Sequence, residues 1–111
     1  MAGEPTFEDF EALGMRVGIV LRAEPNDGAR DAAYKLWIDL GSGEPVQSSA
    51  KITDRYRSDD LVGRQVVVVT GFESLRVGGF RSDVLVLGAL TEGGVVLLEP
   101  DTEVPPGSPV A

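Results

Sequence analysis

The sequence predicts a small all-β barrel. Three β-branched runs, at residues 65–69, 79–88 and 95–98, follow one another in the second half of the chain, with glycines beside them. Runs this short and apolar are typical of buried strands and are too short for stable helices. Residues 34–40 add a clean alternation of apolar and polar side chains, which is the pattern of a strand with one buried face.

The chain length favours one small domain. A domain of 111 residues buries only about two-thirds of its unfolded surface, so self-association is expected to add burial. No apolar run reaches the roughly 20 residues that cross a bilayer, and the first residues are acidic rather than basic as in a signal peptide. We therefore expect a soluble, cytoplasmic protein without membrane insertion.

The composition argues against an enzyme. Cysteine and histidine are both absent, which removes thiol nucleophiles, histidine relays, disulfides and nearly all zinc sites. Ser48 and Ser49 have no neighbouring base to activate them. The adjacent carboxylates Asp59 and Asp60 are more typical of a cap or a solvated loop than of an acid–base pair. We therefore predict no catalytic residue, no metal and no cofactor.

The negative charge is concentrated at the two ends of the chain. Of the 18 acidic residues, four lie in residues 1–13 and four in residues 91–111, and neither segment contains lysine or arginine. The body, residues 14–90, therefore holds ten acidic residues against all ten basic ones, although the whole chain has a net charge of −8. This distribution leaves room for a basic face on the body.

A short amphipathic helix is expected at the N-terminus. Thr6 is a candidate N-cap with Asp9 three residues later, and Phe7, Phe10 and Leu13 follow at helical spacing. Two interpretations remain open for its apolar side: a lid that packs on the barrel, or a contact between two subunits.

Two strands should follow the helix. Residues 15–23 alternate imperfectly, with Val17, Ile19 and Leu21 expected on one face, and lead into a turn-rich loop at the barrel mouth. In residues 34–40 the inward side chains are Tyr34, Leu36, Ile38 and Leu40, which leaves Lys35, Trp37 and Asp39 on the outer face. Trp37 either packs under the terminal helix or a loop, or stacks a base or contacts a peptide.

Residues 46–50 predict a short third strand, and residues 52–57 predict one helical turn capped by Thr53. That turn would carry Arg55, Tyr56 and Arg57 outward, either as a solvated connector or as a contact for phosphates and bases.

Two further segments connect or extend the predicted strands. Residues 72–80 should form a loop in which Gly78 and Gly79 allow close approach of a ligand, flanked by Arg76, Arg81 and Ser82. A flexible connection is the alternative there. The proline-rich residues 100–109 suit an extended edge or arm, and such arms commonly hold a partner subunit.

This order of elements predicts a five-stranded OB-fold Greek-key barrel with a helical turn between the third and fourth strands. We expect one domain over residues 1–111: an N-terminal helix (1–13), the barrel (14–98) and a C-terminal arm (99–111) used in dimerisation.

Several segments also resemble the tRNA-binding OB-domain family, which includes the C-terminal domain of bacterial methionyl-tRNA synthetases. The resemblance covers nearly the whole chain and rests on residues 10–20, 34–41, 61–69, 95–101 and 104–107. Within the family, residues 47–53, Arg55–Tyr56 and residues 79–88 are similar to the CsaA subgroup.

The subgroup resemblance implies a homodimeric, export-related chaperone that binds unfolded preprotein segments, with the secretion machinery as a candidate further partner. The family resemblance implies tRNA binding as the alternative, since Lys35, Ser82 and Leu85 match positions linked to tRNA contact. Departures at Gly71, residues 73–75 and Asp83 make any RNA affinity modest and salt-sensitive.

Two sets of residues follow as site predictions. The peptide- or RNA-binding set is Lys35, Trp37, Phe72, Arg76, Phe80, Arg81, Ser82 and Leu85. The dimer-interface set is Phe7, Phe10, Leu13, Val104 and Pro105.

Overall fold

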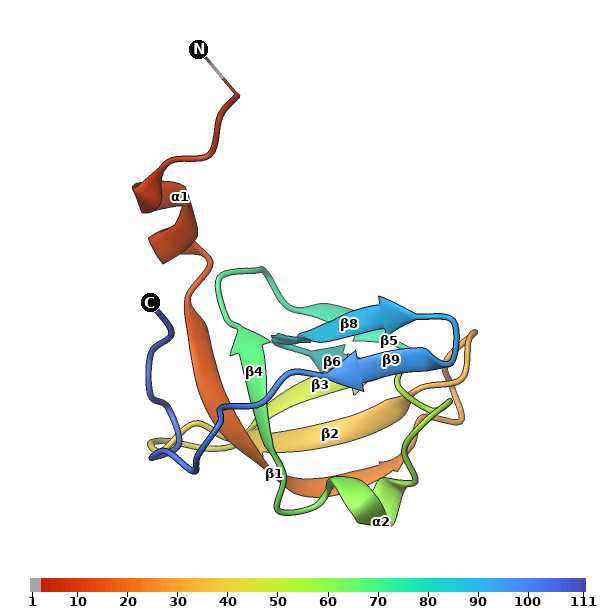
Figure 1. Ribbon diagram of the computed structural model, residues 1–111. Coiled ribbons are helices and arrows are strands. Elements are labelled where there is room, and N and C mark those ends of the chain that lie inside the picture. Colours follow the sequence, from red (N-terminus) through yellow and green to blue (C-terminus); the bar gives the residue numbers. More distant parts are fainter. Residues whose placement is uncertain (1–2) are drawn as a thin grey trace.

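A five-stranded antiparallel sheet curls into a nearly closed barrel in the computed structural model, which describes residues 3–111 (Figure 1). The strand order is β3-β2-β1-β4-β7, so the chain returns to place β4 beside β1 and leaves β3 and β7 at the two ends of the sheet. The predicted OB-type all-β fold is confirmed. The strands are β1 (Met15–Pro25), β2 (Tyr34–Asp39), β3 (Val46–Ala50), β4 (Gln65–Val69) and β7 (Leu85–Val86).

Two hairpins and two short helices complete the fold (Figure 1). One hairpin lies between β4 and β7 along the chain, and the other follows β7. Among residues 3–111, no helix is long and apolar enough to cross a membrane. The additional elements are α1 (Phe7–Ala12), α2 (Ser58–Leu61), the hairpin β5 (Leu75–Val77) with β6 (Phe80–Ser82), and the hairpin β8 (Gly88–Thr91) with β9 (Gly94–Leu97).

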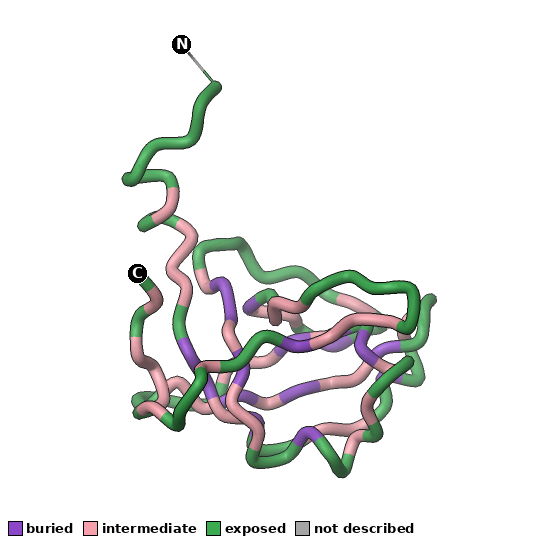
Figure 2. Tube along the Cα trace, viewed as in Figure 1, coloured by how far each residue is buried: buried purple, intermediate pink, exposed green. Residues whose placement is uncertain are grey.

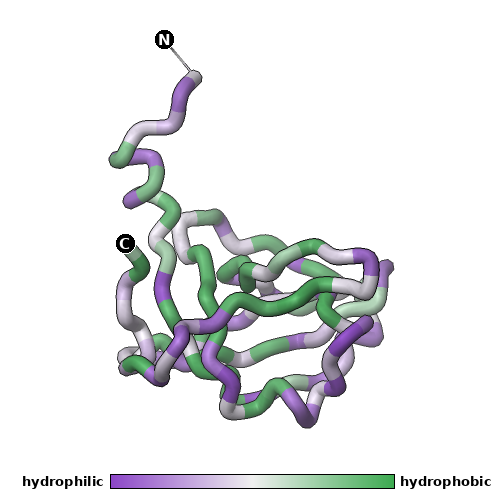
Figure 3. The backbone as a smooth tube through the Cα atoms, in the orientation of Figure 1, coloured by the Kyte–Doolittle hydropathy of each residue, from purple (hydrophilic) through white to green (hydrophobic). Residues whose placement is uncertain are grey.

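The core lies inside the barrel, and its fully buried side chains come mainly from β1, β2 and β4. Figure 2 shows buried segments along these strands, and Figure 3 shows that they are also the apolar ones. The predicted inner face of β2 is confirmed, because Leu36 and Ile38 are fully buried while Tyr34 and Leu40 pack against the core from its edge. Val20, Leu61, Val66 and Val68 fill the rest of the centre.

The predicted faces of β1 are wrong around Val20. Val20 is 1% exposed and lies in the core, whereas Leu21, expected to point inward, is 48% exposed. The pairing of β1 with β2 shifts register between Val20 and Arg22. Val20 precedes this shift and lies opposite the buried Ile38, so it faces the core. The extra residue at the bulge leaves Leu21 and Arg22 both exposed.

The predicted helical turn at residues 52–57 is also wrong, because the helix α2 begins at Ser58 with Arg57 as its N-cap. Ile52 is buried in the core, and Tyr56 faces inward rather than outward. The Tyr34 hydroxyl donates to the Tyr56 carbonyl at 2.7 Å, and the Leu97 N–H donates to the Tyr56 hydroxyl at 3.0 Å. These tertiary contacts hold the segment in a turn.

The continuous strand predicted over residues 79–88 is broken into β6, β7 and the start of β8. The break falls at Asp83 and Val84, whose N–H groups both donate to the Gln47 carbonyl of β3. The predicted loop at residues 72–80 contains strand β5, and Gly78 and Gly79 form the tight turn to β6 with φ of 59° and 79°. Such positive values favour glycine at both positions.

The helix α1 and the C-terminal residues lie at the same end of the barrel (Figure 1). The predicted capping box of α1 is present between Thr6 and Asp9, but none of the six residues of α1, all of them described, is buried. The lid interpretation is therefore wrong. The predicted extended arm is confirmed, since Val17 N–H donates to Ser108 O at 2.9 Å and Val110 N–H donates to Met15 O at 3.0 Å along the edge of β1.

Candidate functional site

An apolar groove lies beside the β5–β6 hairpin, and we call it the hairpin groove. It has a volume of 220 Å³ and is lined mainly by side chains that remain partly or largely exposed to solvent. Phe72, Leu75 and Leu85 are the large exposed apolar side chains among them. The lining residues are Ser49, Phe72, Glu73, Leu75, Val77, Ser82, Asp83, Val84 and Leu85.

Polar side chains attach the hairpin to β3. The Ser82 hydroxyl accepts from Ser49 N–H at 3.0 Å, and the Asp83 carboxylate accepts from Gln47 N–H at 3.1 Å. Side-chain acceptors thus occupy edge positions of β3 that a neighbouring strand would otherwise fill. These bonds fix the geometry of the groove.

Asp83 is the charged centre of this attachment. Burial alone would raise the pKa of its carboxyl, but hydrogen bonds from Gln47 N–H, the Ser74 hydroxyl and the Arg81 guanidinium, together with the Arg81 charge, lower that pKa below its usual value of 3.8. Ser74 Oγ and Arg81 Nε each lie 2.8 Å from the same oxygen, Oδ1. The carboxylate is therefore ionised at neutral pH and holds the hairpin and the preceding loop together.

A second group, the aromatic cluster, lies on the outer face of β2 and is defined by Arg22, Lys35, Trp37 and Phe80. The Trp37 and Phe80 rings meet edge to face with centroids 5.2 Å apart. The Arg22 guanidinium carbon lies 4.5 Å from the Trp37 centroid, and Lys35 Nζ lies 5.5 Å from the Phe80 centroid. Cations above aromatic rings are typical of nucleic-acid-binding surfaces and also of ordinary surface packing.

The structure divides the predicted binding residues between these places. Phe72, Ser82 and Leu85 line the hairpin groove, whereas Phe80 is buried against Trp37. Arg76 and Arg81 are directly opposite each other in the β5–β6 pair. Because side chains alternate along a strand, they lie on the hairpin face opposite Leu75 and Ser82.

Sequence reasoning missed three residues of these surfaces. Leu75 and Val77 line the groove, and they were missed because their segment was expected to be a loop. Arg22 lies opposite Trp37 in the β1–β2 pair, which depends on the register shift that the sequence does not reveal.

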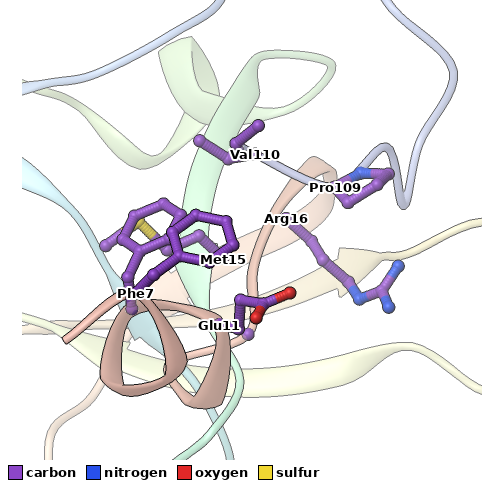
Figure 4. A pocket seen from close by; sticks show the side chains of 9 residues that line it. Phe7, Glu11, Met15, Arg16, Pro109 and Val110 are labelled. Carbon is purple, nitrogen blue, oxygen red and sulfur yellow. The ribbon is translucent and has the colours of Figure 1, made fainter.

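A second apolar depression lies between α1 and the C-terminal residues (Figure 4), and we call it the terminal cleft. It measures 280 Å³, and Phe7 and Phe10 stack on one side of it with ring centroids 6.2 Å apart. Figure 4 shows Met15 beside Phe7, with Val110 and Pro109 on the side opposite the helix. The lining residues are Phe7, Phe10, Glu11, Gly14, Met15, Arg16, Pro109, Val110 and Ala111.

The other predicted dimer residues lie outside this cleft. The Leu13 carbonyl accepts from Gly71 N–H at 2.9 Å. Val104 is bonded through its backbone to the Gln65 side chain, with distances of 2.6 and 3.1 Å, and Pro105 is exposed. Phe7 and Phe10 are therefore brought to residues 109–111, not to Val104 and Pro105.

No group of three or more histidine, cysteine, aspartate or glutamate side chains within residues 3–111 is arranged to hold a metal ion. A small barrel of this topology with open apolar grooves defines a binding module of the OB type.

The family described as "Putative tRNA binding domain" matches residues 15–109, and the chain belongs to this family. Full-length similarity extends to two solved chaperones. The crystal structure of chaperone CsaA from Bacillus anthracis str. Ames is 44% identical with a TM-score of 0.87, covering 98% of this chain and 100% of that one. The CsaA chaperone protein from Picrophilus torridus is 38% identical with a TM-score of 0.90, covering 97% of this chain and 100% of that one.

Among curated proteins, the methionine–tRNA ligase of Methanothrix thermoacetophila is 45% identical over 101 residues. The match covers 91% of this chain but only 15% of the ligase. The chain therefore corresponds to one small part of that enzyme.

Proposed function

We propose that this protein is a homodimeric cytoplasmic chaperone that binds unfolded or export-destined polypeptides in the hairpin groove. The observation that carries the proposal is the groove itself: exposed apolar side chains line a depression whose walls are fixed by Ser82 and Asp83. Similarity over the full length of two CsaA chaperones supports the same function.

The chemistry of the groove suits apolar peptide segments of varied sequence. Phe72, Leu75 and Leu85 offer hydrophobic contact without a deep pocket for one particular side chain. Recognition of this kind is loose in sequence, as a chaperone requires. Arg76, on the other face of the hairpin, is available to acidic residues that flank the bound segment, whereas Arg81 is already paired with Asp83.

The terminal cleft supports self-association. Phe7 is 71% exposed although it belongs to a helix with a well-formed N-terminal cap. Large apolar side chains exposed in this way usually mark a contact surface. We propose that Phe7, Phe10 and Leu13 meet a second copy of the chain, with Val104 and Pro105 at the periphery of the contact.

Binding of tRNA is the second candidate function, and the aromatic cluster favours it. Arg22 and Lys35 flank Trp37 and Phe80, and Arg76 and Arg81 lie on the adjacent hairpin. Two of these cations are already paired, since Arg22 lies 2.8 Å from Glu24 and Arg81 lies 2.8 Å from Asp83. Few unpaired cations therefore remain to contact phosphates, so RNA binding would be modest and salt-sensitive.

Fluorescence anisotropy separates the two functions. The protein is titrated into a labelled bulk tRNA and into a labelled peptide from an unfolded preprotein, each at low and at physiological salt. We expect peptide binding that survives salt and tRNA binding that weakens or disappears. Salt-sensitive tRNA binding without a peptide signal would reverse the order of the two proposals.

Two variants locate the sites. Phe72→Asp should weaken peptide binding, while Val62→Asp, an equally exposed apolar position that does not line the groove, should leave it unchanged. Arg81→Glu should weaken whichever ligand binds beside Ser82. Full retention of binding by Phe72→Asp and Arg81→Glu would assign the ligand to another surface.

A further inference from the structure

The segment that runs from β7 into β8 has one free edge. On its other side, Leu87 N–H donates to Val67 O at 2.9 Å, and Leu87 O accepts from Leu98 N–H at 3.3 Å. In an antiparallel ladder, hydrogen-bonded residues alternate with residues whose N–H and C=O groups point the other way. The groups of Val86, Gly88 and Leu90 therefore point away from β4 and β9.

These outward groups have no hydrogen-bond partner within residues 3–111, whether from backbone or from side chains. The free edge, residues 86–90, is long enough for about 16 Å of extended chain. Gly88 allows Val95 to pack closely against this segment, because a Cβ at residue 88 would lie 2.4 Å from the Val95 side chain.

An apolar groove of 410 Å³ accompanies this edge, and we call it the seam groove because it lies between β3 and β7 at the opening of the barrel. It shares Ser49 and Leu85 with the hairpin groove, so the two are continuous. Its lining residues are Ser49, Ala50, Lys51, Ile52, Leu85, Val86, Leu87, Gly88, Leu90 and Val95.

Other edges of the sheet are protected, and this one is not. Side chains of Ser82 and Asp83 bind the N–H groups of β3, and the C-terminal arm pairs with β1. Residues 85–90 contain no proline and no charged residue, and Leu90 is 88% exposed. An exposed, uncharged strand edge of this kind pairs readily with another extended chain.

We infer that residues 86–90 bind an extended segment of a polypeptide as an added β-strand, with its alternate apolar side chains in the seam groove. This inference rests on the proposed polypeptide-binding function and specifies how the chain is held. Backbone hydrogen bonds give affinity that does not depend on sequence, and the groove selects apolar residues at every second position.

The charge of the groove matches an apolar peptide and not a nucleic acid. Lys51 is the one charged residue among those that line it, and its Nζ lies 2.9 Å from Asp31. A phosphate backbone would therefore meet apolar side chains and a cation that is already paired.

The test uses a fluorescein-labelled peptide of alternating valine and threonine with lysines at its ends, and anisotropy as the readout. Leu90→Pro removes the outward N–H of Leu90 and no internal hydrogen bond, while Leu90→Ala removes the side chain and keeps the N–H. We expect Leu90→Pro to weaken binding about tenfold more than Leu90→Ala does. The proline removes one N–H donor to the bound strand, and its ring displaces the neighbouring backbone groups. Circular dichroism checks that both variants are folded.

Methylated peptides test the same inference without changing the protein. N-methylation of every second amide should abolish binding in one register and spare it in the other, since only alternate amides face the free edge. Equal effects in both registers, or equal binding by Leu90→Pro and Leu90→Ala, would overturn the inference.

Two further outcomes are distinguishable. If no variant and no form of the peptide binds while an unfolded preprotein also fails to bind, the proposed function itself is wrong. If the wild type is a dimer by light scattering and Leu90→Pro is a monomer, the edge pairs two copies of the chain, and the inference is overturned in favour of that contact.

Discussion

The barrel core and the helix α1 both contain large apolar side chains, yet they differ in what covers them. Leu36 and Ile38 are fully buried by their own chain, whereas Phe7 in α1 is 71% exposed. The core is complete without α1, because no residue of that described helix is buried. The difference indicates that apolar residues of the core stabilise the fold, while those of α1 are available to a partner. Variants of the two regions should therefore separate folding from assembly.

Leu36→Ala should have the largest effect on the fold. Truncating a fully buried leucine leaves a cavity, which lowers the free energy of unfolding by about 2–5 kcal/mol. Urea denaturation followed by circular dichroism measures the change. Leu90→Ala is the matched control, since Leu90 is almost fully exposed and its truncation should change stability by no more than about 0.5 kcal/mol. Similar losses in both variants would contradict the burial pattern.

Tyr56→Phe should have the second largest effect. It removes the acceptor of the Leu97 N–H, which is buried, and a buried unpaired donor costs about 1–3 kcal/mol of unfolding free energy. Tyr34→Phe removes one donor from the Tyr56 carbonyl and should cost less, about 0.5–1.5 kcal/mol. Denaturation of the two variants side by side gives the order, and the reverse order would show that the hydroxyl of Tyr56 is not needed by β9.

Asp83→Asn should change how stability depends on pH. Since the folded state lowers the pKa of this carboxyl below its usual value of 3.8, its contribution is complete above that pH. The contribution is lost as the pH falls below 3.8 and through the lowered value, because the unfolded chain then binds a proton more readily. The melting temperature of the variant should therefore fall less than that of the wild type between neutral pH and pH 3.

Glu92→Gln is the control for this series, because Glu92 is an exposed carboxylate at the β8–β9 turn. Its melting temperature should follow that of the wild type at every pH. If Asp83→Asn also follows the wild type, the hydrogen bonds to Asp83 do not stabilise the folded state.

The double variant Phe7→Asp with Phe10→Asp should have the smallest effect on the fold and a clear effect on assembly. The free energy of unfolding measured at low protein concentration should change by less than about 0.5 kcal/mol, since neither ring is buried by its own chain. Light scattering should show a dimer for the wild type and a monomer for the variant. Glu8→Gln in the same helix should remain dimeric, and an unchanged mass of the double variant would exclude α1 from the interface.

Strand β2 shows what the local sequence pattern can predict. Its alternation placed Leu36 and Ile38 inward and Trp37 outward, and the structure agrees. Strand β1 has a comparable composition, but Val20 faces the core opposite Ile38 and a bulge follows it, and only the pairing with β2 reveals both features. The same holds for residues 79–88, where two N–H groups bonded to Gln47 of a distant strand break a continuous apolar run.

The candidate site also combines residues that the sequence could predict with an arrangement that it could not. Phe72, Ser82 and Leu85 could be named from the sequence, since Phe72 and Ser82 flank a glycine-rich loop and Ser82 and Leu85 match positions of the family. Their separation from Arg76 and Arg81 could not be predicted, because it depends on the β5–β6 register and on the face that the hairpin turns toward β3.

The sequence by itself determined the fold class, the capped N-terminal helix, the inner face of β2 and the family, because each depends on local spacing or on residue identity. Only the tertiary structure decided which edges of the sheet are covered and which are open. Coverage depends on hydrogen bonds between residues far apart in the chain, such as Ser49 with Ser82 and Val17 with Ser108. The outer edge of residues 86–90 remains open for the same reason: within the described chain, no segment pairs with the side that faces away from β4 and β9.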